Sequence, residues 1–410
     1  MRKEIEKRST RWFQQRWLMD TVMETIGVEW DQARLAHYAK VCSADAPGIF
    51  RAAGARMKKF SDVHREFRAA ARRIQARAEK YEAAGRTVAA RESYITASLL
   101  WAAARWPLYE VDTRYLEYEA AINACYDKYI QFAPRPVERV EIPFDGKFLS
   151  GLLHLPRKPA DGERFACVLN VGGMDGCKEN VVSMYGDVML ERGVAVLAID
   201  GPGQGQAVSR GVYVTATNHR EAGVAAIDFM QDHPAIDPDR IAIRATSFGT
   251  YFTPLAASAL GDRIKGLATA FVVHEPGLDS IFNAASPTFR MRFMFMAGIT
   301  DEAEFDSYMK GFDLRDVVGG IKCPILILAG EDDELSPIEY TYDLYERISA
   351  PKKLVVYEGA KHSIGGASSV SLGESPGHLI NDWLADRLAG TPMDADENIL
   401  VDMYGKSHQR

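Results

Sequence analysis

Ser247 lies in a stretch whose pattern predicts a serine held ready to attack a carbonyl group. The run from Arg240 to Arg244 has β-branched residues at alternate positions, as a strand does. Small and apolar residues from Thr250 to Leu260 predict a buried helix. Ser247 would therefore occupy a sharp, strained turn between the two. Such a turn requires small residues two positions before and after the serine, and Ala245 and Gly249 meet that demand.

Asp333 and His362 each follow a predicted strand and could activate this serine. A serine hydroxyl is a poor nucleophile at neutral pH, so a base must take its proton. His362 would do so and later deliver the proton to the leaving group, while Asp333 would hold the imidazole in the required tautomer. The neighbouring Asp332 fits the same spacing and stays an alternative. Taken alone, His362 could also be an ordinary loop histidine.

Two backbone amides are expected to stabilise the negative oxygen that forms during such an attack. The amide of Phe248 directly follows the serine, and the amide of Met174 lies in the glycine-rich loop from Gly172 to Gly176. Loss of one such donor raises the reaction barrier by roughly 3–4 kcal/mol. These residue types, in this order, predict nucleophilic acyl chemistry, and no metal ligand is expected.

The residues that could do this chemistry lie after strands that alternate with helices. Such alternation predicts a mostly parallel, doubly wound α/β sheet with helices on both faces. Ligand sites in these sheets lie at the carboxyl ends of the strands, where Ser247, Asp333 and His362 are expected. The predicted strands are 137–156 (a hairpin around Asp145-Gly146), 165–171, 193–200, 240–244, 264–273, 323–329 and 353–358.

A change in composition at Pro134-Arg-Pro136 separates two predicted domains. Residues 1–135 have apolar residues at three- and four-residue spacing, which predicts a helical lid domain. Residues 136–390 are expected to form the catalytic α/β domain. A helical insertion at about 280–313 is expected near the mouth of the site, and residues 391–410 are expected to be a surface tail.

Composition and charge exclude several classes of function. The 410 residues are 47% hydrophobic and 26% charged, with a net charge of −7. The chain therefore lacks the basic excess that binds nucleic acid or an anionic membrane surface. No apolar run reaches the roughly 18 residues that span a bilayer, and the charged N-terminus differs from a signal peptide. The five Cys are scattered without a C-x-x-C pair, which indicates neither disulfides nor zinc. We expect a cytoplasmic protein.

The glycine-rich run Asp200-Gly-Pro-Gly-Gln-Gly205 does not predict a nucleotide site. A dinucleotide fingerprint has the spacing G-x-G-x-x-G and follows the first strand of its unit. This run has the spacing G-x-G-x-G and follows an inner strand. No cofactor is therefore expected.

The chain resembles the α/β-hydrolases related to 2,6-dihydroxypseudooxynicotine hydrolase, the FrsA-type esterases and the fungal polyketide-shortening hydrolases. The resemblance lies in residues 172–179, 200–205 and 314–330, and in the long helical segment before the hydrolase part. The chain departs from this group at Ala245 and Thr246, where the relatives usually have Gly followed by Arg or Trp. The resemblance implies the α/β-hydrolase fold, a helical domain that covers the active site, and a homodimer.

In such relatives the helical domain also supplies walls of the substrate pocket. Trp101, Arg105, Trp106 and Tyr109 form an aromatic and cationic stripe at helical spacing. By resemblance, this stripe would contact an aromatic or acyl substrate. Packing at the domain interface is the alternative interpretation.

The resemblance further implies an extra acidic residue where a carbon–carbon bond is cleaved. Glu275 follows a predicted strand and is the candidate, because a buried carboxyl could have a raised pKa and donate a proton. The alternative is a salt bridge from Glu275 to an arginine of the insertion, such as Arg290 or Arg292.

Together these features predict a serine hydrolase that acts on a small carbonyl compound through an acyl-enzyme. Cleavage of a carbon–carbon bond in an aromatic or β-dicarbonyl ketone is the first expectation. Hydrolysis of an ester, thioester or amide, or acyl transfer, is the second. A ligand-binding protein without catalysis on the same fold is a rival, against which the intact Ser247, Asp333 and His362 argue.

Overall fold

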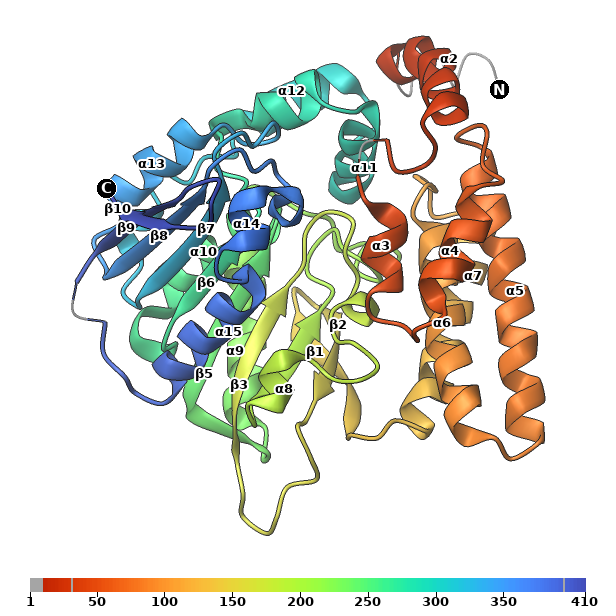
Figure 1. Cartoon of the computed structure of the whole chain (residues 1–410), viewed down its shortest axis with the longest axis horizontal. Coiled ribbons are helices and arrows are strands. Elements are labelled where there is room, and N and C mark those ends of the chain that lie inside the picture. The colour runs from red at the N-terminus through yellow and green to blue at the C-terminus, as the bar shows by residue number, and fades with distance from the viewer. Residues whose placement is uncertain (1–9, 31, 394) are drawn as a thin grey trace.

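The computed structural model describes residues 10–30, 32–393 and 395–410. A bundle of N-terminal helices packs beside a twisted sheet that carries its own helices (Figure 1). The N-terminal segments form the bundle, and the C-terminal strands lie at the edge of the sheet away from it. Early and middle segments of the chain therefore form the boundary between the two parts (Figure 1). None of the described helices is long and apolar enough to cross a membrane.

Within the described residues, ten strands form one sheet in the order β1-β2-β4-β3-β5-β6-β7-β8-β9-β10. Pairing is parallel from β4 through β9, whereas β1–β2, β2–β4 and β9–β10 are antiparallel. This is the mostly parallel α/β sheet that the sequence predicts. The strands are β1 (Val137–Phe144), β2 (Lys147–His154), β3 (Phe165–Val171), β4 (Ala195–Ile199), β5 (Ile236–Thr246), β6 (Leu267–Ala270), β7 (Ile325–Gly330), β8 (Lys352–Tyr357), β9 (Glu397–Val401) and β10 (Ser407–Gln409).

Both faces of the sheet are buried, and the central strand β3 shows how. Phe165, Cys167 and Leu169 point into a core shared with α9 (His219–Asp232) and α10 (Gly249–Leu260). Ala166 and Val168 point the other way, into a core shared with α8 (Val188–Glu191) and α15 (Pro376–Leu388). Successive side chains on a strand alternate between faces, so a strand covered on both sides must be apolar throughout.

The N-terminal helices share a core rich in alanine and aromatic side chains, to which the sheet-bearing part contributes Leu152, Cys177 and Phe295. The two long helices α5 and α6 are joined by a short turn in which Gly85 has a φ of 68°. Helices often end at a residue with positive φ, and glycine adopts this conformation without strain. The described helices are α2 (Thr10–Thr25), α3 (Arg34–Ala39), α4 (Ala46–Gly54), α5 (Asp62–Ala83), α6 (Thr87–Arg105) and α7 (Thr113–Gln131).

The segment between β6 and β7 is helical. It comprises a π-helical turn (Ser280–Ala284), α11 (Pro287–Ala297) and α12 (Glu302–Met309). Further helices, α13 (Ile338–Arg347) and α14 (Ser368–Leu372), flank β8 in the chain.

The C-terminal segment differs from the expected surface tail. Residues 391–410 contribute β9 and β10, which extend the sheet beyond β8. The apolar run Ile399-Leu400-Val401 pairs in parallel with Val355, Val356 and Tyr357. Pairing satisfies backbone groups that would otherwise form an open edge of β8, which is the physical reason for the difference.

Buried histidines predict that the protein loses stability in mild acid. His154, His219 and His274 are buried, and burial lowers their pKa from 6.5 to about 4, 3 and 3, respectively. Each stays neutral in the folded protein while the unfolded chain takes up protons below pH 6.5. The free energy of unfolding should therefore fall by up to about 1.4 kcal/mol per pH unit for each histidine as the pH drops from about 6 to 4.

Urea unfolding at pH 7.5, 6.0 and 5.0 measures this dependence. His154→Phe is the control variant, because it removes one titrating group and should reduce the slope of stability against pH by up to about 1.4 kcal/mol per pH unit. A stability that stays level between pH 7.5 and 5.0 contradicts the prediction.

Candidate active site

Ser247 occupies the turn between β5 and α10 with a φ of 53°. A non-glycine residue rarely adopts this left-handed conformation, so the surrounding structure must hold it there. The Ser247 amide donates to the carbonyl of Ala270 on the next strand, at 3.0 Å. The Ser247 carbonyl accepts from the amide and the hydroxyl of Thr250, both at 2.7 Å. Both backbone polar groups of the strained residue are thus bonded within the sheet and helix.

The close approach of β3 explains the small residues around Ser247. A Cβ atom on Gly249 would lie 2.4 Å from the carbonyl oxygen of Val171 and 3.2 Å from the Cβ of Ala245. The glycine is therefore required at the helix start. On the other side of the turn, a single methyl group at Ala245 is accommodated.

His362 and Asp333 lie next to Ser247, although the three residues are far apart in the chain. Ser247 Oγ is 3.1 Å from His362 Nε2, and His362 Nδ1 is 2.9 Å from Asp333 Oδ2. Asp333 Oδ1 also accepts from the amides of Leu335 and Ser336, at 2.9 and 3.0 Å. These bonds hold the Asp333 carboxylate in place beside the His362 imidazole. The neighbouring Asp332, the alternative left open by spacing, is exposed and makes no such contact with His362 among the described residues.

The glycine-rich loop after β3 touches the serine directly. A Cβ atom on Gly173 would lie 2.8 Å from the Cβ of Ser247 and 3.2 Å from its Oγ, so only glycine fits. The side-chain amide of Gln204 donates to the carbonyls of Gly172 and Gly173, at 2.7 and 2.9 Å. Gln204 belongs to the 200–205 run, which therefore supports this loop through the Gln204 side chain.

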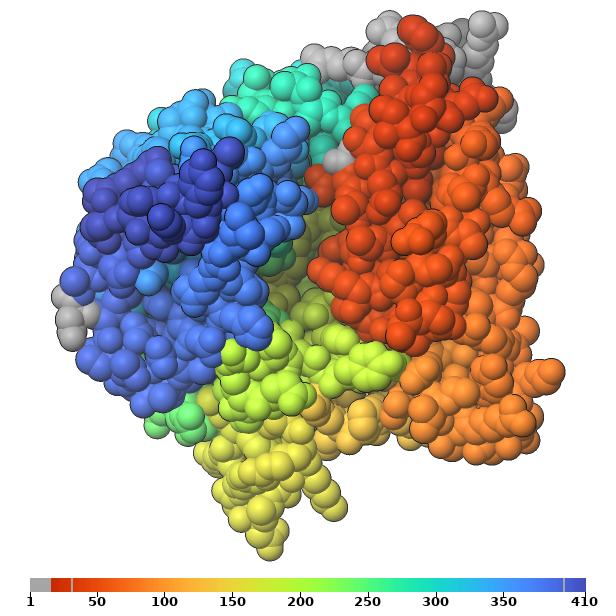
Figure 2. Space-filling model, in the orientation of Figure 1, coloured from red at the N-terminus to blue at the C-terminus, as the bar shows by residue number. Residues whose placement is uncertain are grey.

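A cavity of about 390 Å³ opens beside Ser247, between the helical bundle and the sheet. Its floor includes Thr246, Ser247, Phe248 and His362 together with the loop from Gly173 to Gly176. Figure 2 shows a hollow between the early and late parts of the chain, with middle segments visible at its base. Both predicted oxyanion residues, Met174 and Phe248, line this cavity, and Thr246 faces it.

One wall of the cavity is apolar and comes from the sheet-bearing part of the chain, including the insertion. It is formed by Phe271, Ile281, Phe289 and Leu335. Phe271 has a φ of 57°, and its ring centroid is 6.3 Å from that of His362. The strained conformation at Phe271 turns the chain after β6 toward the cavity.

The opposite wall is formed by α3, which sequence reasoning missed. Arg34, His37, Tyr38 and Lys40 line the cavity there. Burial, together with Lys40, lowers the pKa of His37 to about 4, so this imidazole is neutral. Its Nε2 lies 2.7 Å from the side-chain amide of Asn180 and accepts that hydrogen bond. No motif surrounds α3 in the sequence, and its place over Ser247 follows only from how the bundle packs.

A family comparison identifies the group to which these features belong. The family described as "Esterase FrsA-like" matches residues 66–389, which is most of the chain. The chain belongs to the FrsA-like esterase family. Its α/β sheet with an N-terminal helical region is that of an α/β-hydrolase.

Several characterised proteins are similar to this family member. The 2,6-dihydropseudooxynicotine hydrolase of Paenarthrobacter nicotinovorans is 25% identical over 76% of this chain and 80% of its own length. The 20-hydroxy-prefusarin hydrolase FUS2 of Gibberella moniliformis is 32% identical over 49% of this chain and 50% of its own length. The chain thus spans about half the length of this relative and of three other fungal relatives that it matches. The crystal structure of a 2,6-dihydroxy-pseudo-oxynicotine hydrolase shares the fold, with a TM-score of 0.73, 23% identity, and coverage of 88% of this chain and 97% of that one.

The stripe expected to contact substrate lies elsewhere in this FrsA-like protein. Among the described residues, none of Trp101, Arg105, Trp106 and Tyr109 lines the cavity. The Trp101 indole donates to Gln75, at 3.0 Å, inside the bundle. All four residues belong to the core or the interface of the helical part, in line with the alternative interpretation.

The other three residues of this stripe pack at the boundary between the two parts. Arg105 forms a buried ion pair with Glu119, at 3.2 Å. The Trp106 indole donates to Asp175 of the glycine-rich loop, at 2.7 Å. The Tyr109 ring lies 6.5 Å from that of Phe295 on α11. These three residues support the walls of the cavity without lining it. Helical spacing alone does not reveal which side of the bundle faces the serine, so the sequence could not show this.

Glu275 is buried but does not line the cavity in the part of the chain that the structure describes. Its Oε2 accepts from the amide of Ser280, at 2.7 Å, and so holds the start of the π-helical turn. The expected salt bridge to an insertion arginine is not formed either. Arg290 pairs with Asp306 at 2.6 Å, and Arg292 lies over the ring of Phe295.

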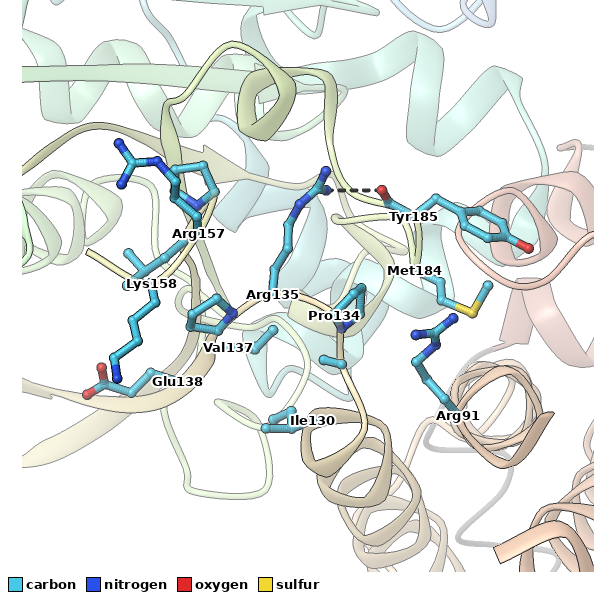
Figure 3. Close-up of a pocket in the computed structure, with 14 residues that line it drawn as sticks. Arg91, Ile130, Pro134, Arg135, Val137, Glu138, Arg157, Lys158, Met184 and Tyr185 are labelled. Atoms are coloured by element: carbon cyan, nitrogen blue, oxygen red, sulfur yellow. Dashed lines mark hydrogen bonds between the residues drawn. The ribbon is translucent and has the colours of Figure 1, made fainter. Parts of the chain in front are cut away.

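A second, larger depression lies away from the serine. This open groove of about 860 Å³ is formed where α7 ends and β1 begins (Figure 3). Arg135 crosses it and donates to the carbonyl of Tyr185, at 3.0 Å. Ser247, Asp333 and His362 do not line it. Among the described residues, no group of three or more His, Cys, Asp or Glu side chains is placed to hold a metal ion. The cavity beside Ser247 is therefore the candidate active site.

The contact between Gly249 and β3 generates a stability prediction. Gly249→Ala should lower the free energy of unfolding by about 1–3 kcal/mol, because the added methyl group overlaps the Val171 carbonyl. Gly48→Ala is the matched control: a methyl group there meets no atom within 4 Å, in the helix α4. It should leave stability unchanged or raise it by up to about 1 kcal/mol. Equal effects of the two substitutions in urea unfolding would argue against the packing described.

Proposed function

We propose that this protein is a serine hydrolase that acts through Ser247, His362 and Asp333. The observation that carries the proposal is the chain of hydrogen bonds from the serine hydroxyl to the imidazole and on to a buried carboxylate. This chain opens on a cavity large enough for a small molecule. A nucleophile, a base and a residue that orients the base are the parts that covalent acyl chemistry needs.

The geometry suggests the following steps. Ser247 Oγ attacks the carbonyl carbon of the substrate while its proton passes to His362 Nε2. The electron pair of the C=O bond moves to the oxygen, where the amides of Met174 and Phe248 would donate to it. Collapse of this intermediate expels the leaving group, which takes the proton from His362. Water then attacks the acyl-enzyme and gives one proton to His362. As the bond from the acyl carbon to Ser247 Oγ breaks, His362 returns this proton to Ser247 Oγ, and a carboxylic acid is released.

The first substrate class we propose is an aromatic or β-dicarbonyl ketone cleaved at a carbon–carbon bond. In that case the leaving group departs as an enolate, and the proton from His362 goes to its carbon. The apolar wall of Phe271, Ile281, Phe289 and Leu335 suits an aromatic or acyl group. The similarity to a hydrolase named for an oxynicotine compound supports this class.

An ester, thioester or amide, or acyl transfer, is the second class, supported by membership in an esterase family. Both classes use the same nucleophile and the same acyl-enzyme. A ligand-binding protein without catalysis would need neither the short contact between Ser247 and His362 nor the strained φ at Ser247.

Labelling with a fluorophosphonate probe and hydrolysis of a p-nitrophenyl ester test the nucleophile. Ser247→Ala should abolish both. Asp333→Asn should lower kcat by about 10⁴-fold, because the imidazole then adopts the wrong tautomer. Asp332→Asn is the matched control and should keep wild-type activity, since this side chain is exposed. Absence of labelling at Ser247 in the folded wild-type protein would favour the ligand-binding alternative.

Glu275→Gln tests whether Glu275 has a role in carbon–carbon bond cleavage. Its carboxylate is occupied by the Ser280 amide, and Glu275→Gln keeps an acceptor oxygen there. We therefore expect this substitution to change kcat less than about threefold on a β-diketone and on an ester alike. A loss of 100-fold or more on the ketone alone would instead assign Glu275 a role as proton donor in carbon–carbon bond cleavage.

A further inference from the structure

Asp175 is a charged residue that the proposed mechanism does not use, although it directly follows Met174. Its Oδ2 accepts from Arg34 Nη1 and its Oδ1 accepts from the indole of Trp106, both at 2.7 Å. Arg34 opens α3, and Trp106 follows the end of α6. Both partners therefore belong to the helical bundle, whereas Asp175 belongs to the loop that touches Ser247.

The three side chains form one compact group. The guanidinium carbon of Arg34 lies 3.7 Å from the centroid of the Trp106 ring, within the range of a cation–π contact. Burial alone would raise the pKa of Asp175. Arg34, Arg292 and the Trp106 hydrogen bond outweigh burial and keep this pKa below its ordinary value. Asp175 is thus an ionised carboxylate whose two oxygens are each bonded to the bundle.

The loop has a second anchor on the side of the sheet. Gln204 binds the carbonyls of Gly172 and Gly173, and its own oxygen accepts from the amide of Gly201. Gln204 thus fixes the first part of the loop, where Gly173 packs on the serine. Asp175 fixes the part immediately after Met174. Within the described residues, the Met174 amide lies between these two attachments.

We propose that Asp175 is a positioning residue through which the helical bundle sets the Met174 amide for stabilisation of the oxyanion. The inference rests on the proposed function, because it assigns an oxyanion role to that amide. Donors of this kind act only when aimed at the place where the charge develops, and a displacement of about 1 Å can cost about 10²-fold in rate. A hydrolase part without the docked α3 and α6 would keep Ser247, His362 and Asp333 and yet lack a fixed donor.

Asp175→Asn tests this role, because the amide keeps the shape of the side chain and loses the charge that pairs with Arg34. We expect kcat for p-nitrophenyl butyrate to fall by about 10- to 100-fold while KM changes less than threefold. The affinity for phenylboronic acid, which forms a tetrahedral adduct on a reactive serine, should fall by a similar factor. The pH dependence of kcat should keep its shape, since His362 and Asp333 are untouched.

Trp106→Phe is a second variant, which keeps a ring under Arg34 and removes one hydrogen bond to Asp175. It should lower kcat and boronate affinity together, by a smaller factor, and it keeps the test open if Asp175→Asn does not fold. Glu191→Gln is the matched control. It breaks an exposed ion pair with Arg135, away from the cavity, and should leave kcat unchanged.

The outcomes separate the two proposals. A wild-type protein that binds no boronate and shows no labelling of Ser247 would overturn the serine hydrolase itself. A wild-type protein that is labelled, with Asp175→Asn and Trp106→Phe at wild-type kcat and boronate affinity, would overturn only the role of Asp175. A loss that appears in KM and in thermal stability, without loss of boronate affinity, would also overturn it, because it would mark a purely structural contact.

Discussion

The strained backbone at Ser247 is the constraint on which the site depends. An L-residue with a φ of 53° is held only where neighbouring segments leave it no alternative. A Cβ atom on Gly249 would lie 2.4 Å from the carbonyl oxygen of Val171 at the end of β3, and Gly173 packs directly against Ser247. Two segments distant in the sequence, residues 171–173 and 247–249, thus meet at this turn. Gly249 is needed because a Cβ atom there would overlap the backbone carbonyl of Val171, and Gly173 is needed because a Cβ atom there would overlap the Ser247 side chain.

Much of the fold could be predicted from the sequence because its signals are local. The hairpin of β1 and β2 follows from Asp145-Gly146, both of which have positive φ in the structure. The buried strands follow from their unbroken apolar runs. The positions of Ser247, Asp333 and His362 follow from a general property of parallel sheets, whose strands end at one edge. Spacing in the sequence could not decide between Asp332 and Asp333, because it does not show which of the two side chains is buried.

The rest could not be predicted because it depends on how distant elements pack. Trp101 and Trp106 are aromatic residues of the kind that line substrate pockets. In the structure, the Trp101 indole instead donates to Gln75 inside the bundle, and the Trp106 indole donates to Asp175 of the glycine-rich loop. The short helix α3 has no sequence signature and still forms a wall of the cavity. Residues 391–410 lack the length and hydrophobicity of an inner strand. Their pairing with β8 became visible only in three dimensions.

The two edges of the sheet carry a consequence for association between molecules. An open strand edge invites pairing with another chain, and proteins blunt such edges with charge, proline or shortness. On one side, β1 carries Glu138, Arg139, Glu141 and Pro143. On the other, β10 has three exposed residues and is followed by Arg410. The sheet is therefore protected at both ends from growth by strand addition, which lowers its tendency to aggregate through β-pairing.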